Sequence, residues 1–246
     1  MSRSNPTDNS PNPSTRWYEW DGANGLVRYY DKAKGEVIAV PDGFTYLLLD
    51  ETATIKGWND PAESGIYSNE VRDTRQDTML VKLFKGGTVI ASGLYADIKD
   101  RVAAAGGHFT ATNYIAFRTG EQLHIGAIQF KGAALGAWME FKKANRAEIY
   151  KSAIQIKGFV EGKKGKVVFR TPVFHLKPIQ EETEKLALEL DKQLQTYLTG
   201  YFSRTKSAAA QPPAGPVPPT DDEPTMSEPP LPEPDGAPDI GDGVPF

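Results

Sequence analysis

Residues 108–132, HFTATNYIAFRTGEQLHIGAIQFKG, contain two runs of alternating residues that meet at Thr119-Gly120. β-Branched and aromatic residues dominate both runs, and a turn residue pair between such runs is typical of a hairpin. Because side chains alternate between the faces of a strand, one face of the first run is apolar. The other face carries Thr110, Thr112, Tyr114 and Arg118. The stretch predicts a β-hairpin in which Tyr114 and Arg118 point outward together.

Further strand-like runs flank this hairpin on both sides. They are 44–58, 66–71, 78–84 and 88–95 before it, and 148–162 and 163–177 after it, the last two forming a second hairpin about Gly162 to Gly165. Two short segments, 97–107 and 132–145, have helical composition instead. This mainly β pattern suits a closed or partly closed barrel with added hairpins. The oligonucleotide-binding Greek-key barrel (OB fold) is the first candidate because it combines strands with an interposed helix, and a β-sandwich is the structural alternative.

The segment 180–206 has the pattern of an amphipathic helix. Three acids occupy its first turn, where the helix dipole favours anions, and apolar residues follow at helical spacing: Ala187, Leu190, Leu194, Tyr197 and Tyr201. We expect this helix to pack on the β domain, because its apolar stripe is shorter than the three or four heptads of a convincing coiled coil. Self-association into a homo-oligomer through the helix is the alternative.

Both ends of the chain have compositions that disfavour folding. Residues 1–15 are polar, rich in Pro, Asn and Ser, and lack the apolar stretch of a secretory signal. Residues 207–246 contain eight acids, no Lys or Arg, and twelve of the chain's 19 prolines. Such segments bury too little apolar surface to offset chain entropy. We therefore expect a disordered lead at 1–15, a β domain at 16–179, the helix, and a disordered acidic tail at 207–246.

The lack of cysteine and of long apolar runs bears on where in the cell the protein is expected. The chain has no cysteine, which removes disulfides, thiolate metal sites and cysteine nucleophiles. No run approaches the roughly 18 apolar residues of a membrane span. We expect a cytoplasmic protein with no membrane partner.

The net charge of −4 is the sum of an acidic tail and a basic body. Outside the tail, 28 Lys and Arg residues stand against 24 acids. The excess is largest at 131–177, where eleven basic, three acidic and six aromatic residues are interleaved. Phosphates need cations along their path and each base offers a π-face, so this mixture is typical of a groove for single-stranded nucleic acid. Aromatic residues packed in a core and solvated lysine-rich turns are the alternative interpretation.

We predict DNA contacts from this segment and from the hairpin at 108–132. The candidates for phosphate contacts are Arg118, Lys142, Lys143, Arg146, Lys157, Lys163, Lys164, Lys166 and Arg170. The candidates for stacking on bases are Tyr114, Trp138, Tyr150 and Phe159. Phe159 is the strongest of them, because strict alternation places it beside Lys157 on a polar face. For Trp58 we favour a core position at the barrel end over a stacking role.

Residues suited to catalysis or metal binding are sparse. His108, His124 and His175 lack the spacing of zinc ligands, and the stretch 158–167 lacks the spacing and the Ser or Thr of a phosphate-binding Walker loop. Glu161-Gly162-Lys163 matches the E-x-K element of metal-dependent nucleases, with its supposed partner Pro41-Asp42 far upstream. We expect no catalytic residue, metal or cofactor, and a metal-dependent nuclease is the enzyme alternative.

The chain ends in APDIGDGVPF at 237–246, which joins acids, an aromatic side chain and the terminal carboxylate. This ending resembles the tip of single-stranded-DNA-binding proteins, whose bacterial members close in Ile-Pro-Phe and whose bacteriophage counterparts carry acidic tails ending in Phe. The matching residues are Asp239, Asp242, Val244, Pro245 and Phe246; Gly241 and Gly243 stand where the family usually has more acid. The strict match is confined to this tip, and the body looks more like a bacteriophage-encoded version than the bacterial domain.

The resemblance implies sequence-independent binding of single-stranded DNA during replication, recombination and repair, with a tip that recruits partner enzymes. Physical reasoning adds that the tethered acidic tail competes with DNA for the basic groove, because a flexible tail of this length reaches roughly 35 Å. A strand-annealing recombination protein is a variant of the same class. The alternative from another class is an adaptor without a DNA role, whose prolines at 211–220 bind partner proteins.

Overall fold

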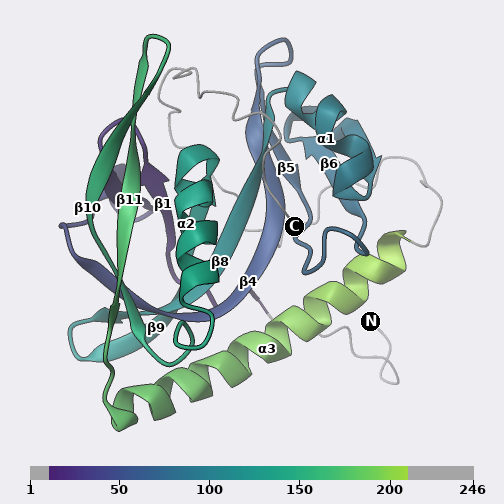
Figure 1. Ribbon diagram of the computed structural model, residues 1–246. Coiled ribbons are helices and arrows are strands. Elements are labelled where there is room, and N and C mark those ends of the chain that lie inside the picture. The colour runs from purple at the N-terminus through teal and green to yellow at the C-terminus, as the bar shows by residue number, and fades with distance from the viewer. Residues whose placement is uncertain (1–10, 210–246) are drawn as a thin grey trace, which may run out of the picture.

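A computed structural model describes residues 11–209, and strands dominate this range (Figure 1). The strands are β1 (Trp17–Asp21), β2 (Leu26–Asp31), β3 (Glu36–Ala39), β4 (Phe44–Asn59), β5 (Ser64–Ser68), β6 (Met79–Leu83), β7 (Val89–Gly93), β8 (Gly107–Thr119), β9 (Gln122–Lys131), β10 (Ala153–Lys164) and β11 (Val167–Lys177). The helices are the 3-10 turn η1 (Lys85–Gly87), α1 (Tyr95–Ala104), α2 (Gly132–Ala144) and α3 (Glu181–Ala209). The prediction of a mainly β protein is confirmed. For Trp17, Tyr18 and Trp20 the sequence left an N-terminal edge strand and a stacking contact open, and they lie in β1, whereas β2 and β3 lie where no strand was expected.

The β8–β9 hairpin and β4 form the centre of the sheet. β8 pairs with β9 from Thr110↔Lys131 to Thr119↔Gln122, which confirms the predicted hairpin. On its other side β8 pairs with β4 along almost the whole strand. Because β4 is 16 residues long, its two halves meet different neighbours on the side away from β8.

Those neighbours divide the sheet into two lobes that share β4 and β8. The first half of β4 pairs with β10, whose hairpin partner is β11, and the second half pairs with β5, which continues to β6 and β7. At the opposite edge β1 pairs with β9 in parallel, followed by β2 and β3. The first lobe is therefore β11-β10-β4-β8-β9-β1-β2-β3, and the second is β8-β4-β5-β6-β7.

The first lobe bends around α2, so that strands lie on both sides of this helix (Figure 1). Buried residues of β1, β2, β4, β8, β9, β10 and β11 share one hydrophobic core with α2. Trp138 of α2 lies within this core and has no exposed surface. Burial of such large apolar side chains contributes roughly 1.5–3 kcal/mol each, which holds the helix inside the curve of the sheet.

The expected barrel is not closed by strand pairing. Among the described strands, none of the pairings joins β11 to β1, β2 or β9, as closure would require. The two edges approach at the β1–β2 turn, where the Arg170 amide donates to the Gly22 carbonyl (2.8 Å) and Trp20 Nε1 donates to the Arg170 carbonyl (2.8 Å). The barrel stays open because β1 occupies the edge of β9, and its turn, instead of a strand, meets β11.

The other two helices cover one face each. α1 packs on the second lobe, where Ile98 and Val102 share a small core with strands β4 to β7. α3 crosses the outer face of β8 and β9 (Figure 1), and its Leu194 and Leu198 are fully buried there against Tyr114. The predicted packing of the C-terminal helix on the β domain is confirmed. Within residues 11–209, none of the helices has the length and apolar character needed to span a membrane.

Candidate nucleic-acid interface

Trp138, a predicted stacking residue, is part of the core. It has no exposed surface, its ring lies 5.6 Å from that of Phe130 and 5.4 Å from that of Phe174, and its Nε1 donates to Glu51 Oε2 (2.8 Å). The prediction that Trp138 stacks on bases is therefore wrong. The segment 131–145 is rich in cations, but α2 turns its apolar stripe into the curve of the sheet.

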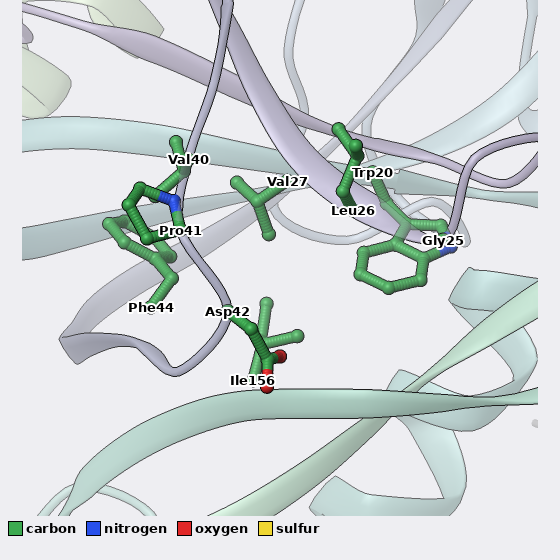
Figure 2. Close-up of a pocket in the computed structure, with 9 residues that line it drawn as sticks. All are labelled: Trp20, Gly25, Leu26, Val27, Val40, Pro41, Asp42, Phe44 and Ile156. Atoms are coloured by element: carbon green, nitrogen blue, oxygen red, sulfur yellow. The ribbon is translucent and has the colours of Figure 1, made fainter.

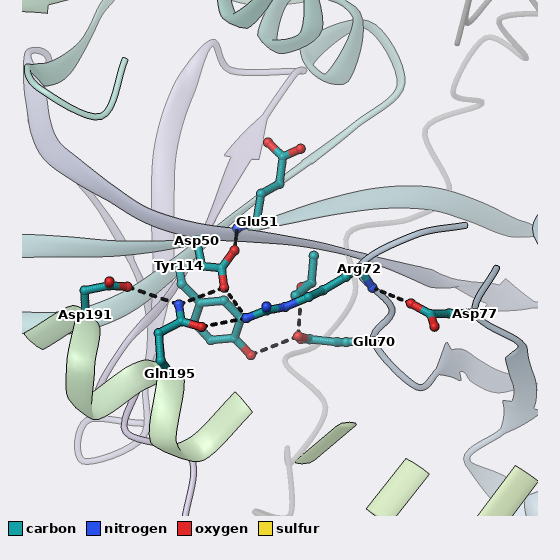
Figure 3. A network of polar contacts seen from close by, with 9 residues as sticks. Asp50, Glu51, Glu70, Arg72, Asp77, Tyr114, Asp191 and Gln195 are labelled. Carbon is teal, nitrogen blue, oxygen red and sulfur yellow. Dashed lines mark hydrogen bonds and ion pairs between the residues drawn. The ribbon is translucent and has the colours of Figure 1, made fainter. Parts of the chain in front are cut away.

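Tyr114 is also buried, although the predicted alternation of β8 is correct. It lies on the outer face of the strand, and α3 covers that face, so only 1% of the residue is exposed. Its hydroxyl donates to Glu70 Oε2 (2.9 Å), as Figure 3 shows. Burial, together with the Glu70 carboxylate, raises the pKa of Tyr114 well above its ordinary value. The prediction that Tyr114 points outward to DNA is wrong, because an outer sheet face is exposed only where no other element covers it.

A polar network fastens α3 over this face (Figure 3). Arg72 Nη2 donates to Asp50 Oδ2 (2.6 Å) and to Gln195 Oε1 of α3 (2.7 Å). Gln195 Nε2 in turn donates to the same Asp50 oxygen (2.9 Å). Near it, Glu70 Oε2 accepts hydrogen bonds from Thr52 Oγ1 (2.8 Å) and the Tyr114 hydroxyl. Burial raises the pKa of Glu70 above its ordinary value, while these two hydrogen bonds act in the opposite direction.

Four predicted DNA-binding residues lie at the C-terminal end of α2 and in the loop after it: Lys142, Lys143, Arg146 and Tyr150. Lys142 is ion-paired with Glu51, whereas Lys143 and Arg146 are exposed and Tyr150 is 59% exposed. Arg118 is exposed near the β8–β9 turn, where its Nη1 donates to the Glu121 carbonyl (2.9 Å). The structure thus disperses these candidates instead of gathering them into one groove.

The remaining candidates lie together on the outer part of the β10–β11 hairpin, residues 157–172, which we call the arm. It projects from the body at the top of Figure 1. The arm carries five basic residues and one acid, Glu161. Lys157, Lys163, Lys164 and Lys166 are exposed, and Val160 and Val168 are 62% and 43% exposed. A two-stranded ribbon whose outer end has both faces in solvent can reach a ligand that the body does not touch.

The arm separates from β4 at a bulge in β10. The register between β10 and β11 shifts between Ile156 and Phe159, and Gly158 there has a φ of +74°, which glycine adopts without steric cost. The Gly158 amide donates to Asp42 Oδ1 (2.9 Å), which holds the bulge to the β3–β4 connection. Beyond the bulge β10 pairs with β11 alone.

The bulge also corrects the predicted face of Phe159. Strict alternation sets Phe159 opposite to Ile156, whereas in the structure Ile156 pairs with Phe174 and Phe159 pairs with Pro172. Since Phe174 and Pro172 share one face of β11, Phe159 lies on the same side as Ile156. Phe159 is nevertheless 44% exposed, and Arg170 Cζ lies 5.3 Å from its ring centroid. It remains available as an aromatic surface beside a cation.

The root of the arm is tightly packed against the β1–β2 turn. A side chain at Gly25 would meet Phe159 Cδ1 and Arg170 Cδ at 2.6 Å, and the φ of Gly25 is +70°. Beside this contact lies a small cavity of about 50 Å³ (Figure 2), lined by Trp20, Gly25, Leu26, Val27, Val40, Pro41, Asp42, Phe44 and Ile156. Ligand pockets usually measure about 300–1,000 Å³. This cavity is too small for a nucleotide.

The residues of the possible nuclease element do not assemble a metal site. Glu161 Oε2 pairs with Arg170 Nη2 (3.3 Å), and Asp42 is engaged with the Gly158 amide. Among residues 11–209 there is no group of three or more His, Asp or Glu side chains arranged to hold a metal ion. The predicted partner-binding residues Asp239, Asp242, Val244, Pro245 and Phe246 lie outside the described residues.

One exposed aromatic pair was missed by the sequence reasoning. Tyr67 of β5 and Phe84, directly after β6, stack with ring centroids 4.5 Å apart, and Phe84 is 54% exposed. The signal was present at 78–84, where Met79 and Val81 alternate with Leu80, Lys82 and Phe84. No protein-family model matches the chain, and comparison with curated proteins and with solved structures found no match.

Proposed function

We propose that this protein is a non-enzymatic, sequence-independent single-stranded-DNA-binding protein. The observation that carries the proposal is the arm: a projecting ribbon with five basic residues, one acid, and Phe159 exposed beside Arg170. Lysines spaced along a ribbon suit a phosphate backbone, and an exposed ring suits the π-face of any base. Neither contact reads base edges, so the binding has no sequence preference.

An open, elaborated OB-like barrel is part of the same proposal. β4, β8 and β9 follow one another as neighbours, α2 comes next, and β10 then returns to lie beside β4. The spatial order β10-β4-β8-β9 is that of a Greek key, in which the fourth strand lies beside the first. In an OB fold the loop between the fourth and fifth strands contributes to oligonucleotide binding. In this chain that loop is the tip of the arm.

The acidic tail supplies the second half of the proposal. Its tip would recruit replication and recombination enzymes, as the ending at Asp242 to Phe246 suggests by resemblance. Because the tail carries eight acids and the arm carries a basic excess, the tail would also compete with DNA for the arm. DNA binding would then release the tip for its partners.

Fluorescence anisotropy tests the proposal with labelled oligo-dT and a matched duplex at two salt concentrations without magnesium. We expect tight, salt-sensitive binding to the single strand, weaker binding to duplex, and tighter binding at low salt after truncation behind Ala209, where α3 ends. Replacing Lys163 and Lys166 by Ala should weaken binding and reduce the salt slope by about 1.4, from roughly 0.7 per single-strand phosphate contact.

The matched control replaces two exposed lysines of α3, Lys185 and Lys192, by Ala and should leave the salt slope unchanged. A chain that binds neither DNA form contradicts the proposal and favours the adaptor. Degradation of the oligonucleotide on adding magnesium favours the nuclease instead.

A further inference from the structure

The second lobe presents an outer sheet face on which aromatic and basic residues alternate. Registers place Lys56 opposite Tyr67, and Tyr67 opposite Lys82, so these three side chains form one row across β4, β5 and β6. In the next row Trp58 lies opposite Gly65, and the Phe84 amide donates to the Gly65 carbonyl (3.0 Å). Trp58 and Phe84 therefore flank a residue that has no side chain.

The rings of this face are accessible. Phe84 is 54% exposed and stacks on Tyr67, which is partly exposed. Trp58, for which the sequence favoured a core position, is partly exposed as well. Val89 and Leu80, neighbours on the same face, are 52% and 37% exposed. The buried residues of β6, Met79 and Val81, point to the opposite side, into the core under α1. The core of the lobe thus does not require these rings to be aromatic.

The rows of this face carry basic residues and no acid, and Lys56, whose pKa burial lowers, interacts with the carboxylates of Glu70 and Glu19 outside these rows. The rows contain Lys56, Lys82 and, across β8 and β9, His108 and Lys131. The other members of the same rows are Trp58, Gly65, Phe84, Tyr67, Val89, Thr54, Thr110, Leu80 and Ser92, and none of them is acidic. A surface of stacked rings among lysines is complementary to a polyanion that carries planar bases.

α3 separates this surface from the rest of the outer sheet face. The helix buries Tyr114, Ile125 and Ala127 near the middle of β8 and β9, whereas Phe84 and Val89 at the other end of the face stay exposed. The arm and the β4–β5 hairpin project from the same side of the molecule (Figure 1). A flexible strand bound to the arm can therefore extend toward the second lobe.

We propose that the face formed by Lys56, Trp58, Tyr67, Lys82 and Phe84 is a second binding surface for the same single strand, with Phe84 and Trp58 as base-stacking residues. The inference rests on the proposed function and adds a site to it. The arm holds one stretch of the strand and this face holds another. The length of DNA needed for full affinity is then set by both surfaces.

The first test replaces Phe84 by Ala in the full chain and measures oligo-dT affinity by anisotropy. We expect about a tenfold weakening, because each stacked base contributes roughly that much or more. Leu188→Ala on α3 is the matched control, since Leu188 is 53% exposed and Phe84 54%, and it should leave the affinity unchanged. Equal affinities of these two variants would overturn the inference.

The second test uses oligo-dT of increasing length and tryptophan fluorescence. The Phe84→Ala variant should stop gaining affinity at a shorter length than the unchanged chain. Trp58→Phe should reduce the quenching by oligo-dT, and because Trp20 and Trp138 are 8% and 0% exposed, the half-buried Trp17 supplies the quenching that remains. Identical length profiles, together with a weakened Lys163/Lys166 variant, would reject the second surface and keep the arm. A chain that binds no single strand rejects the proposed function itself.

Discussion

The β8–β9 hairpin and the β10–β11 hairpin have similar patterns of apolar and polar residues but opposite environments. Both alternate apolar and polar residues and carry an aromatic residue on the face expected to be polar, Tyr114 in one and Phe159 in the other. Tyr114 is 1% exposed beneath α3, whereas Phe159 is 44% exposed on the arm. The comparison teaches that an aromatic residue in a strand becomes an exposed residue or a core residue according to what covers its face.

The largest expected effect is on stability and tests the claim that a covered aromatic residue belongs to the core. Trp138→Ala should lower the free energy of unfolding by about 3–5 kcal/mol, because it empties a fully buried site and leaves Glu51 Oε2 without its hydrogen-bond donor. Urea unfolding followed by circular dichroism measures the loss. The fraction that stays folded should bind oligo-dT with unchanged affinity. A stable variant with weakened DNA binding would instead make Trp138 a stacking residue and reverse our correction.

A smaller effect, on affinity, tests the exposed side. Phe159→Ala should weaken oligo-dT binding by about 1–3 kcal/mol, the usual contribution of one stacked base, while the free energy of unfolding changes by less than about 1 kcal/mol. Val160→Ala is the matched control, because Val160 is 62% exposed on the opposite face of the arm. If both variants bind oligo-dT as the unchanged chain does, the arm holds DNA through its cations alone.

The smallest effect is a pH dependence at the contact between α3 and the sheet. Burial raises the pKa of Glu70 in the folded protein, so the folded state favours the protonated carboxyl and the unfolded state loses its proton at lower pH. The free energy of unfolding therefore falls as pH rises from the ordinary Glu value of about 4.3 to the raised folded value.

The Glu70→Gln variant isolates this effect, because an amide oxygen can still accept the hydrogen bonds of Thr52 and Tyr114. Relative to the unchanged chain, it should gain stability as pH rises through the same window. Urea unfolding of both proteins across that window measures the difference. A difference that is constant with pH would show that the Glu70 carboxyl has the same pKa in the folded and unfolded states.

Several elements could be predicted from the local sequence. Some elements that were not predicted are nevertheless flanked by residues typical of turns. The hairpin at 108–132 and the helix after residue 180 followed from periodicity, because each buries one face along its length. The strands β2 and β3 were missed, although Asp21 to Gly25 and Asp31 to Gly35 have the composition of tight turns. In both turns the glycine amide donates to the aspartate carbonyl (2.8 Å) and the glycine φ is +70°.

The sequence by itself determined the mainly β class, the helix that packs on the sheet, and the segregation of basic residues at 131–177 from acids at 207–246. These properties depend on neighbours in the chain, so periodicity and composition are enough to find them. Only the tertiary structure decided that β1 leaves the sheet open, that α3 buries Tyr114, and that the bulge at Gly158 turns Phe159 to the other face. Each of these depends on which distant segment covers a face or pairs with an edge. Alternation assigns a side chain to one face or the other, but burial requires a second element, whose position no local pattern contains.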